Sequence, residues 1–287
     1  MRSVASRTSF RRRFVNGLML GLTYVAAGVA TLPLLFVLVY LLAKGVSAVN
    51  WSYFTSLPRP PGMGGGGAAN AIVGTLVIVA GASVMGVPIG IGAGIYLAER
   101  KGAPLAVFVR FLADVLNGLP SIVMGIFAWE LVVVPMGHFS ALAGALALGA
   151  MMIPTVTRTT EEMVRVVPST LREAALALGY TRWRTSLRIV LPTALAGIVT
   201  GVLVALARVA GETAPLLFTA FGNDFWSLSL NQPMNALPLQ IFNYAISPYD
   251  DWHAQAFAGA LVLIALVLII SLLARAATGR GFARASE

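Results

Sequence analysis

The segment "VPSTLREAALALGYTRWRTSLRIVLP" (residues 167–192) begins with a pattern that predicts a short helix. Thr170 followed three residues later by Glu173 forms a capping box, which is typical of a helix start. Apolar residues at helical spacing give this helix one apolar face: Leu171, Ala174, Ala175 and Leu178. Gly179 can adopt the positive φ that ends a helix, so we expect the chain to turn there.

A second short helix is predicted from about Arg182 to Val190, before Pro192 turns the chain into the next apolar run. This helix carries Arg182, Arg184 and Arg188. The simplest interpretation of the whole segment is an amphipathic linker whose arginines face lipid headgroups at the membrane surface.

Long apolar runs lie on both sides of this segment. The chain has 287 residues, of which 58% are hydrophobic and 11% charged, whereas a soluble domain is usually about 25% charged. We therefore predict an all-α, polytopic membrane protein with six transmembrane helices, because each run approaches or exceeds the roughly 20 residues that span a bilayer. The predicted spans cover residues 17–43, 71–98, 105–134, 139–156, 194–221 and 254–274. The first run is too long for a cleavable signal and lacks a small-x-small cleavage site.

Composition also limits the chemistry. The chain has no cysteine and two histidines, which argues against disulfides, thiolate chemistry and a histidine-rich metal site. We expect no catalytic residue, no metal and no cofactor bound by this chain. A net charge of +9 would suggest nucleic acid in a soluble protein, but here most arginines flank apolar runs and indicate topology instead.

The positive charges orient the chain. When the N-terminus is placed in the cytoplasm, the external segments carry only Lys44 and Arg59, so both termini are predicted to be cytoplasmic. We expect a basic cytoplasmic segment over residues 1–16. A single transmembrane domain follows over 17–287, with a cytoplasmic loop at about 157–193.

The stretch "RVAGETAP" (residues 208–215) places two charges inside the fifth predicted span. Arg208 and Glu212 are four residues apart and would share one face of a helix. A charge at mid-span costs at least about 2.5–3.5 kcal/mol, so such residues usually face the bundle interior and serve transport. The alternative is an ion pair within the helix that only neutralises both groups.

An anion pathway is the functional interpretation of this pair. A guanidinium suits an oxyanion, and the carboxylate can accept a hydrogen bond from the P–OH group of phosphate, whereas sulfate offers no such donor. Thr213 could donate to the anion or bond to its own helix. Asn117 and Ser121 could line the same path, because Gly118 and Pro120 between them disturb the third span; a packing kink is the alternative.

"EAALALG" (173–179), followed after nine residues by "IVLP" (189–192), resembles the EAA loop of ABC-importer permeases. The matching residues are Glu173, Ala174, Ala175, Gly179, Ile189, Leu191 and Pro192. The resemblance implies a type I ABC importer permease (MetI-like) fold. It also implies a coupling helix that docks on a cytoplasmic ATPase, with Arg182 and Arg184 in the same coupling segment. Glu173 could equally act only as the capping residue.

Four further stretches resemble the A-type permease subunits of Pst phosphate importers. They are "RVAGETAPLLFTA" (208–220), "LNQPMNALPLQIFNYAISPY" (230–249), "NAIVGTL" (70–76) and "LNGLPSIVMGIF" (116–127). The resemblance implies a bacterial inner-membrane subunit that assembles with a homologous permease, a homodimeric ATPase and an extracytoplasmic phosphate-binding protein.

The nucleotide site is expected on the ATPase, which would hold ATP and Mg. This sequence has no GxxxxGK[ST] motif, so the chain itself is not expected to be an enzyme. Membrane lipid is an expected partner and nucleic acid is not. Two other functions stay open: a permease of the same fold for another oxyanion, such as sulfate or molybdate, and a stand-alone channel or secondary transporter.

Overall fold

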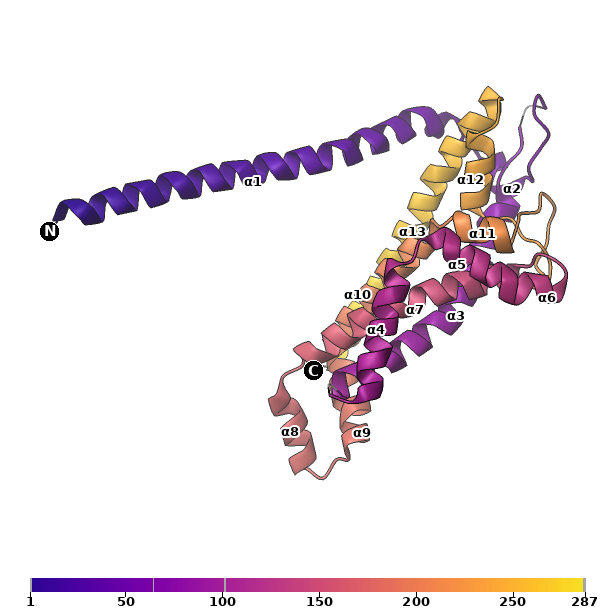
Figure 1. Ribbon diagram of the computed structural model, residues 1–287. Helices are drawn as coiled ribbons and strands as arrows, with labels where there is room; N and C mark the ends of the chain where they lie inside the picture. The colour runs from indigo at the N-terminus through magenta and orange to yellow at the C-terminus, as the bar shows by residue number, and fades with distance from the viewer. Residues whose placement is uncertain (1, 64, 101, 286–287) are drawn as a thin grey trace.

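The computed structural model describes residues 2–63, 65–100 and 102–285, which form helices joined by loops (Figure 1). Among these residues the only extended pairing is an isolated parallel bridge between Phe221 and Met234. The predicted all-α class is confirmed.

Two helices, α3 (Ala69–Glu99) and α7 (Ala141–Val166), pack along each other at the centre of the bundle. Gly90 and Gly94, one turn apart, lie on the side of α3 that faces α7. A Cβ atom at Gly90 would lie 2.7 Å from Val156 Cβ, so a larger residue would push the helices apart. Small residues allow this close approach, which drives helix association where lipid is as apolar as the side chains.

A neighbouring side of α7 packs against α10 (Leu191–Ala210). A Cβ atom at Gly201 would lie 2.4 Å from Thr159 Oγ1, which places these two residues at the same level of the bundle. The fourth span was predicted to end at residue 156, but α7 continues as a helix to Val166. Charged residues after 156 led to the early boundary, because the prediction followed hydropathy.

The helix that contains α10 begins before the predicted turn. Together α9 (Arg182–Thr185), the π-helical turn η3 (Ser186–Val190) and α10 form one helix from Arg182 to Ala210. The predicted turn at Pro192 is therefore wrong. Pro192 lies in the first turn of α10, and the π-helical turn before it shifts the hydrogen-bond register around the missing N–H.

The third predicted span is bent rather than straight. Its first half is α4 (Pro104–Gly118), and its second half, Ser121–Met136, meets α4 at an angle of 105°. This second half consists of α5 (Ser121–Ala128), the π-helical turn η2 (Trp129–Val133) and α6 (Val134–Met136). Pro120 has no N–H to continue the helix, and Leu119 and Pro120 adopt extended backbone angles.

The fifth predicted span is also interrupted. After α10 ends at Ala210, the chain leaves the helix at Gly211 and starts α11 (Ala214–Thr219). Pro215 favours the break, because it lacks the N–H that a continuous helix would use and fits the first turn of the new helix.

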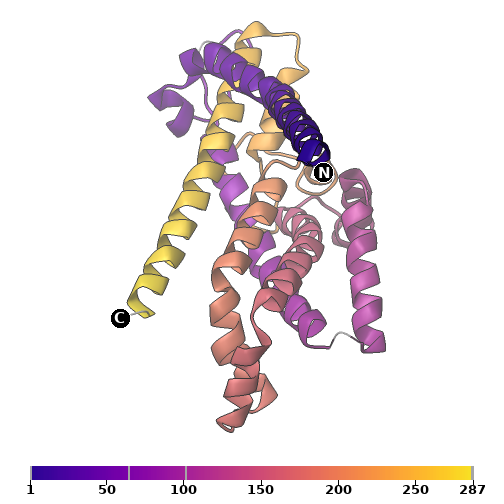
Figure 2. The same cartoon turned by 90° about the vertical axis from the view of Figure 1, so that its left-hand side faces the viewer.

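The remaining long helices pack at one end of the bundle. There α13 (Asp250–Ala285) contacts α12 (Leu237–Ala245) and the end of α1 (Arg2–Gly45). The last turns of α1 touch α13 through Tyr40 and Phe257, whose ring centres lie 5.6 Å apart. The rest of α1 extends away from the bundle (Figures 1 and 2). The turn η1 (Val46–Ala48) and the short helix α2 (Trp51–Thr55) lead from α1 to α3.

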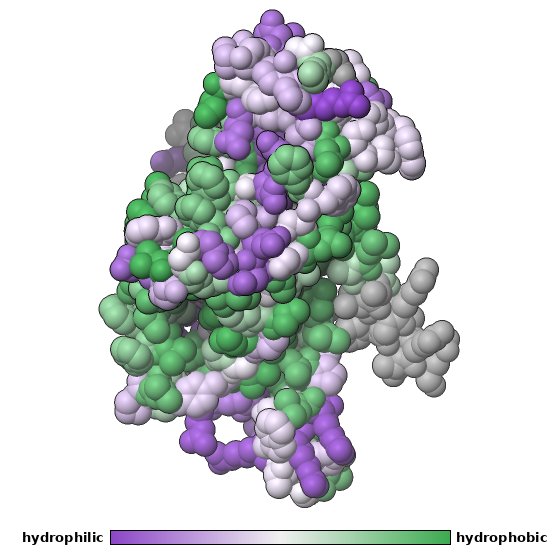
Figure 3. Space-filling model, turned by 90° about the vertical axis from the view of Figure 1, so that its right-hand side faces the viewer, coloured by the Kyte–Doolittle hydropathy of each residue, from purple (hydrophilic) through white to green (hydrophobic). Residues whose placement is uncertain are grey.

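Five helices among the described residues are long and apolar enough to cross a membrane, or six if α4 and the helix after its bend count as one span. They cover Phe10–Ala48, Ala69–Glu99, Ala141–Val166, Arg182–Ala210 and Asp250–Ala276. Figure 3 shows hydrophobic side chains over much of one face, with hydrophilic ones at its two ends and in a group across its middle. The chain is a multi-span membrane protein, and the predicted count of six holds with the third span bent.

Candidate functional site

The two helix breaks lie close together. A Cβ atom at Gly125 of α5 would lie 2.8 Å from Pro215 Cα and 3.3 Å from the Ala214 carbonyl oxygen, so α5 packs against the start of α11. Ser121 lies one turn before Gly125. Thr213 directly precedes α11, so the packing of α5 on α11 brings these two predicted residues into one region.

The charged pair sits at the second break. Arg208 lies in the last turn of α10, and Glu212 lies beyond its end. The prediction that they share a helical face is wrong, because Pro215 ends the helix between them. Arg208 Nε and Glu212 Oε1 are 3.8 Å apart, an ion pair too long for a hydrogen bond. The side chains are 49% and 19% exposed, so the guanidinium can turn to another acceptor.

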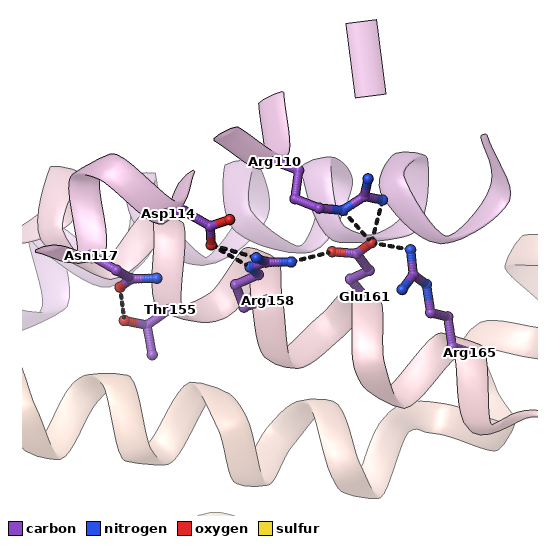
Figure 4. Close-up of polar contacts among 7 residues, drawn as sticks. All are labelled: Arg110, Asp114, Asn117, Thr155, Arg158, Glu161 and Arg165. Atoms are coloured by element: carbon purple, nitrogen blue, oxygen red, sulfur yellow. Dashed lines mark hydrogen bonds and ion pairs between the residues drawn. The ribbon is translucent and has the colours of Figure 1, made fainter. Parts of the chain in front are cut away.

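Asn117 points to a different neighbour from Ser121. It lies one residue before the end of α4, and its Oδ1 accepts a hydrogen bond of 3.2 Å from Thr155 Oγ1 of α7 (Figure 4). Asn117 therefore joins α4 to α7 just below the break, while Ser121 begins the helix above it.

The predicted coupling residues form a hairpin of helices that projects from one end of the bundle (Figure 1). Helix α8 (Ser169–Ala177) is followed by Gly179 with φ +84°, which confirms the predicted glycine turn. The predicted capping box is wrong. Pro168 holds the N-cap position, so Thr170 lies inside the first turn and caps nothing.

The apolar face predicted for α8 points mostly outward. Only Ala175 is buried, whereas Glu173, Ala174 and the leucines of this face are exposed. Arg182 and Arg184 are exposed on α9. A cavity of about 580 Å³ lies between α8, α9 and the end of α3. It is lined by Tyr96, Glu99, Arg172, Arg182 and Trp183 among others, and Arg172 pairs with Glu99.

A larger charge cluster, which the sequence interpretation missed, joins α4 to α7 (Figure 4). At its centre Glu161, with a side chain 1% exposed, accepts hydrogen bonds from Arg110 Nη2 at 2.6 Å and Nε at 3.1 Å. Arg165 Nη2 lies 2.5 Å from the same oxygen, and Arg158 Nη1 lies 3.3 Å from the other. Arg158 also binds Asp114 of α4.

Spacing along the sequence indicates the two charged faces that form the cluster, although not their pairing. Arg110, Asp114 and Asn117 lie on one face of α4. Arg158, Glu161 and Arg165 lie on one face of α7 in the same way. Because the fourth span was predicted to end at 156, Arg158 and Arg165 were interpreted as topology signals, and Glu161 was not singled out.

The loop after α11 is anchored on α3. Asn70 Nδ2 donates to the Asn223 carbonyl at 2.7 Å, and Thr75 Oγ1 accepts from Leu237 N at 2.8 Å. Tyr244 stacks on Trp252 with ring centres 4.4 Å apart. Burial raises the pKa of Tyr244 to about 12. No group of three or more potential metal ligands occurs among the described residues.

Comparisons with known proteins agree with this architecture. Residues 86–280 match the family described as binding-protein-dependent transport system inner membrane component. The phosphate transport system permease protein PstA of Yersinia pestis is 46% identical over 243 residues, covering 84% of this chain and 82% of that protein. PstA of Xylella fastidiosa (strain Temecula1) is 46% identical over 268 residues, covering 93% of each.

Solved structures show the same fold. A bacterial alginate ABC transporter in complex with an alginate pentasaccharide-bound periplasmic protein aligns with a TM-score of 0.63 at 13% identity, covering 93% of this chain and 94% of that one. The MetNI methionine ABC transporter in an inward-facing conformation aligns at 0.54 with 21% identity, covering 87% and 98%. The predicted type I importer fold and the resemblance to Pst permeases are confirmed: the chain belongs to the binding-protein-dependent transport system inner membrane components, the permeases of ABC importers.

Proposed function

We propose that this chain forms, with a homologous partner subunit, the transmembrane pathway for inorganic phosphate in an ATP-driven importer. The 46% identity to permeases named for phosphate transport supports the substrate. The observation that carries the proposal is the loose Arg208–Glu212 pair at a helix break, where α5 and α11 meet.

Phosphate fits this pair chemically. A guanidinium that is half exposed and 3.8 Å from its carboxylate can offer two parallel N–H donors to an oxyanion without first breaking a tight hydrogen bond. Glu212 can accept the P–OH hydrogen bond of protonated phosphate, and it repels sulfate, which has no such proton. Ser121 and Thr213 add hydroxyls near the same break, and Asn117 lies below it.

Coupling to ATP hydrolysis runs through the hairpin of α8 and α9. The hairpin, with Glu173 and Ala174 exposed on α8, Ala175 packed inward and Gly179 at the turn, would dock on a cytoplasmic ATPase dimer that holds ATP and Mg. The continuous helix from Arg182 to Ala210 is about 40 Å long. A displacement of its α9 end, which carries Arg182 and Arg184, would therefore be transmitted directly to Arg208.

The other partners follow from this arrangement. An extracytoplasmic phosphate-binding protein would deliver phosphate at the end of the bundle that carries α12 and the loop anchored on Asn70. Both termini would lie in the cytoplasm of a bacterium, with the spans in its inner membrane. The chain itself performs no hydrolysis in this scheme.

Phosphate uptake by reconstituted complex carrying Arg208→Gln tests the proposal. We expect uptake to fall more than tenfold while the ATPase still co-purifies, with Arg208→Lys intermediate because it keeps the charge but not the planar fork. Loss of ATPase binding in Arg208→Gln would instead assign Arg208 a structural role. Uptake that resists vanadate would exclude an ATP-driven importer, and stronger competition by sulfate or molybdate than by phosphate would identify another oxyanion as substrate.

A further inference from the structure

Arg158 presents a guanidinium fork whose present acceptor is an exposed carboxylate. We propose that Arg158 forms a second oxyanion position in the permease, and that Asp114 occupies this fork when phosphate does not. The inference rests on the proposed phosphate pathway and adds to it a second binding position, distinct from Arg208.

The fork has the geometry of oxyanion recognition. Arg158 Nε donates to Asp114 Oδ1 at 2.9 Å, and Arg158 Nη2 donates to the same oxygen (Figure 4). Two donors on one edge of a guanidinium are the arrangement that binds carboxylate or phosphate oxygens. The Asp114 side chain is 51% exposed, so water can solvate it when an incoming anion displaces it.

Glu161 holds the fork in place from the other side. Arg158 Nη1 donates to Glu161 Oε2 at 3.3 Å, while Arg110 and Arg165 hold the opposite carboxylate oxygen. Glu161 is buried and has three cationic neighbours, so it cannot leave without exposing them to one another. Glu161 is therefore a positioning residue, and Asp114 is the exchangeable partner.

The charge balance favours an anion. Three arginines and two carboxylates leave the cluster with one net positive charge (Figure 4). Charged side chains within a span avoid lipid and face a bundle interior or a water-filled space. Phosphate bound to Arg158 as its monoanion would neutralise the cluster. Asp114 would compete with it, so that binding stays weak enough for release.

The height of the cluster places it after Arg208 on the way to the coupling hairpin. Thr159, the residue next to Arg158, packs on Gly201 of α10, so Arg158 lies at about the height of Gly201 in the bundle. Arg208 lies seven residues further along α10, so it is about 10 Å farther from the hairpin than Gly201 is. The polar pair of Asn117 and Thr155 lies one turn from Arg158 on the side of the α4 break. In height, the cluster therefore lies between Arg208 and the hairpin.

Phosphate binding by the purified complex tests this assignment separately from uptake. Radiolabelled inorganic phosphate is equilibrated by dialysis with nucleotide-free complex lacking the binding protein, in nanodiscs of zwitterionic lipid. In an Arg208→Gln background, Asp114→Asn removes the competitor, and we expect it to bind phosphate about tenfold more tightly than the background alone. Adding Arg158→Gln should abolish that gain, and Arg158→Lys should weaken binding because the fork is lost.

Each of the other possible results contradicts a specific part of the proposal. Equal phosphate binding with and without Asp114→Asn, in variants that still co-purify with the ATPase, would reduce the cluster to a clamp between α4 and α7. Displacement of the phosphate by anionic lipid at low mole fraction would make the fork a headgroup site and refute the inference. Binding of sulfate in place of phosphate would keep the oxyanion position but refute the proposed substrate.

Discussion

Two charged groups lie about 10 Å apart in height in this bundle, and they differ in how firmly they are held. Arg208 and Glu212 approach only to 3.8 Å and are partly exposed. Glu161, in contrast, is buried and bonded to three arginines, one of them at 2.6 Å. A loose pair can exchange partners, whereas a buried, saturated carboxylate fixes the residues around it. The comparison suits the Arg208–Glu212 pair to binding substrate and Glu161 to holding its neighbouring arginines in position.

The largest effect is expected from Glu161→Gln, which removes the charge that compensates three arginines. Loss of one partner from a buried ion cluster lowers stability by about 3–5 kcal/mol. The complex should therefore unfold at a markedly lower temperature and co-purify with less of the ATPase subunit. The matched control is Glu162→Gln, because Glu162 is exposed on the next position of α7. Equal melting temperatures for both variants would show that Glu161 does not stabilise the fold.

Arg208→Gln should lower phosphate uptake but leave the stability of the complex almost unchanged. An exposed, loose ion pair contributes about 0–1 kcal/mol to stability, so the melting temperature of the complex should stay close to that of the wild type. Thermal unfolding of the same preparation used for uptake measures this directly. A drop as large as that of Glu161→Gln would mean that both groups are structural and would end the contrast between them.

Hydropathy and short motifs predicted the fold well but the breaks poorly. Gly179 and the apolar runs are local features, and their turn and spans follow from them. Pro215 and Pro192 both lie in apolar segments predicted to be helical. The helix is broken just before Pro215, whereas it runs without a break through Pro192. Pro88 of α3 and Pro154 of α7 also lie inside continuous helices, so a proline in an apolar run does not by itself predict a break.

The candidate site was predicted only where charge interrupted an apolar run. Arg208 stands out because apolar residues surround it, whereas Arg158 lies in a polar stretch that also fits a cytoplasmic loop. Its importance depends on Asp114, 44 positions away in sequence, and on the packing of α4 against α7. Pairings of this kind arise from tertiary packing and cannot be found from spacing on one helix alone.

A moderate effect is expected from Pro215→Ala, which tests why the pair is loose. Without the proline, α10 can continue toward α11, and Arg208 and Glu212 can meet on one helical face in a tighter ion pair. Phosphate uptake should then fall severalfold while ATPase binding persists. Pro192→Ala is the matched control, because the helix already runs through that position; a similar loss of uptake in both variants would show that the break is not the cause.

The smallest and most specific effect concerns selectivity. Glu212→Gln keeps a hydrogen-bond acceptor but removes the charge that repels fully deprotonated sulfate. Sulfate should therefore inhibit phosphate uptake a few-fold more strongly than in the wild type, while uptake itself changes little, because Arg208 still supplies the fork. Competition curves for sulfate in both proteins, with ATPase binding checked, measure this shift. If Glu212→Gln discriminates between the anions as the wild type does, Glu212 serves only to pair with Arg208, and the selectivity must arise in the binding protein or the partner subunit.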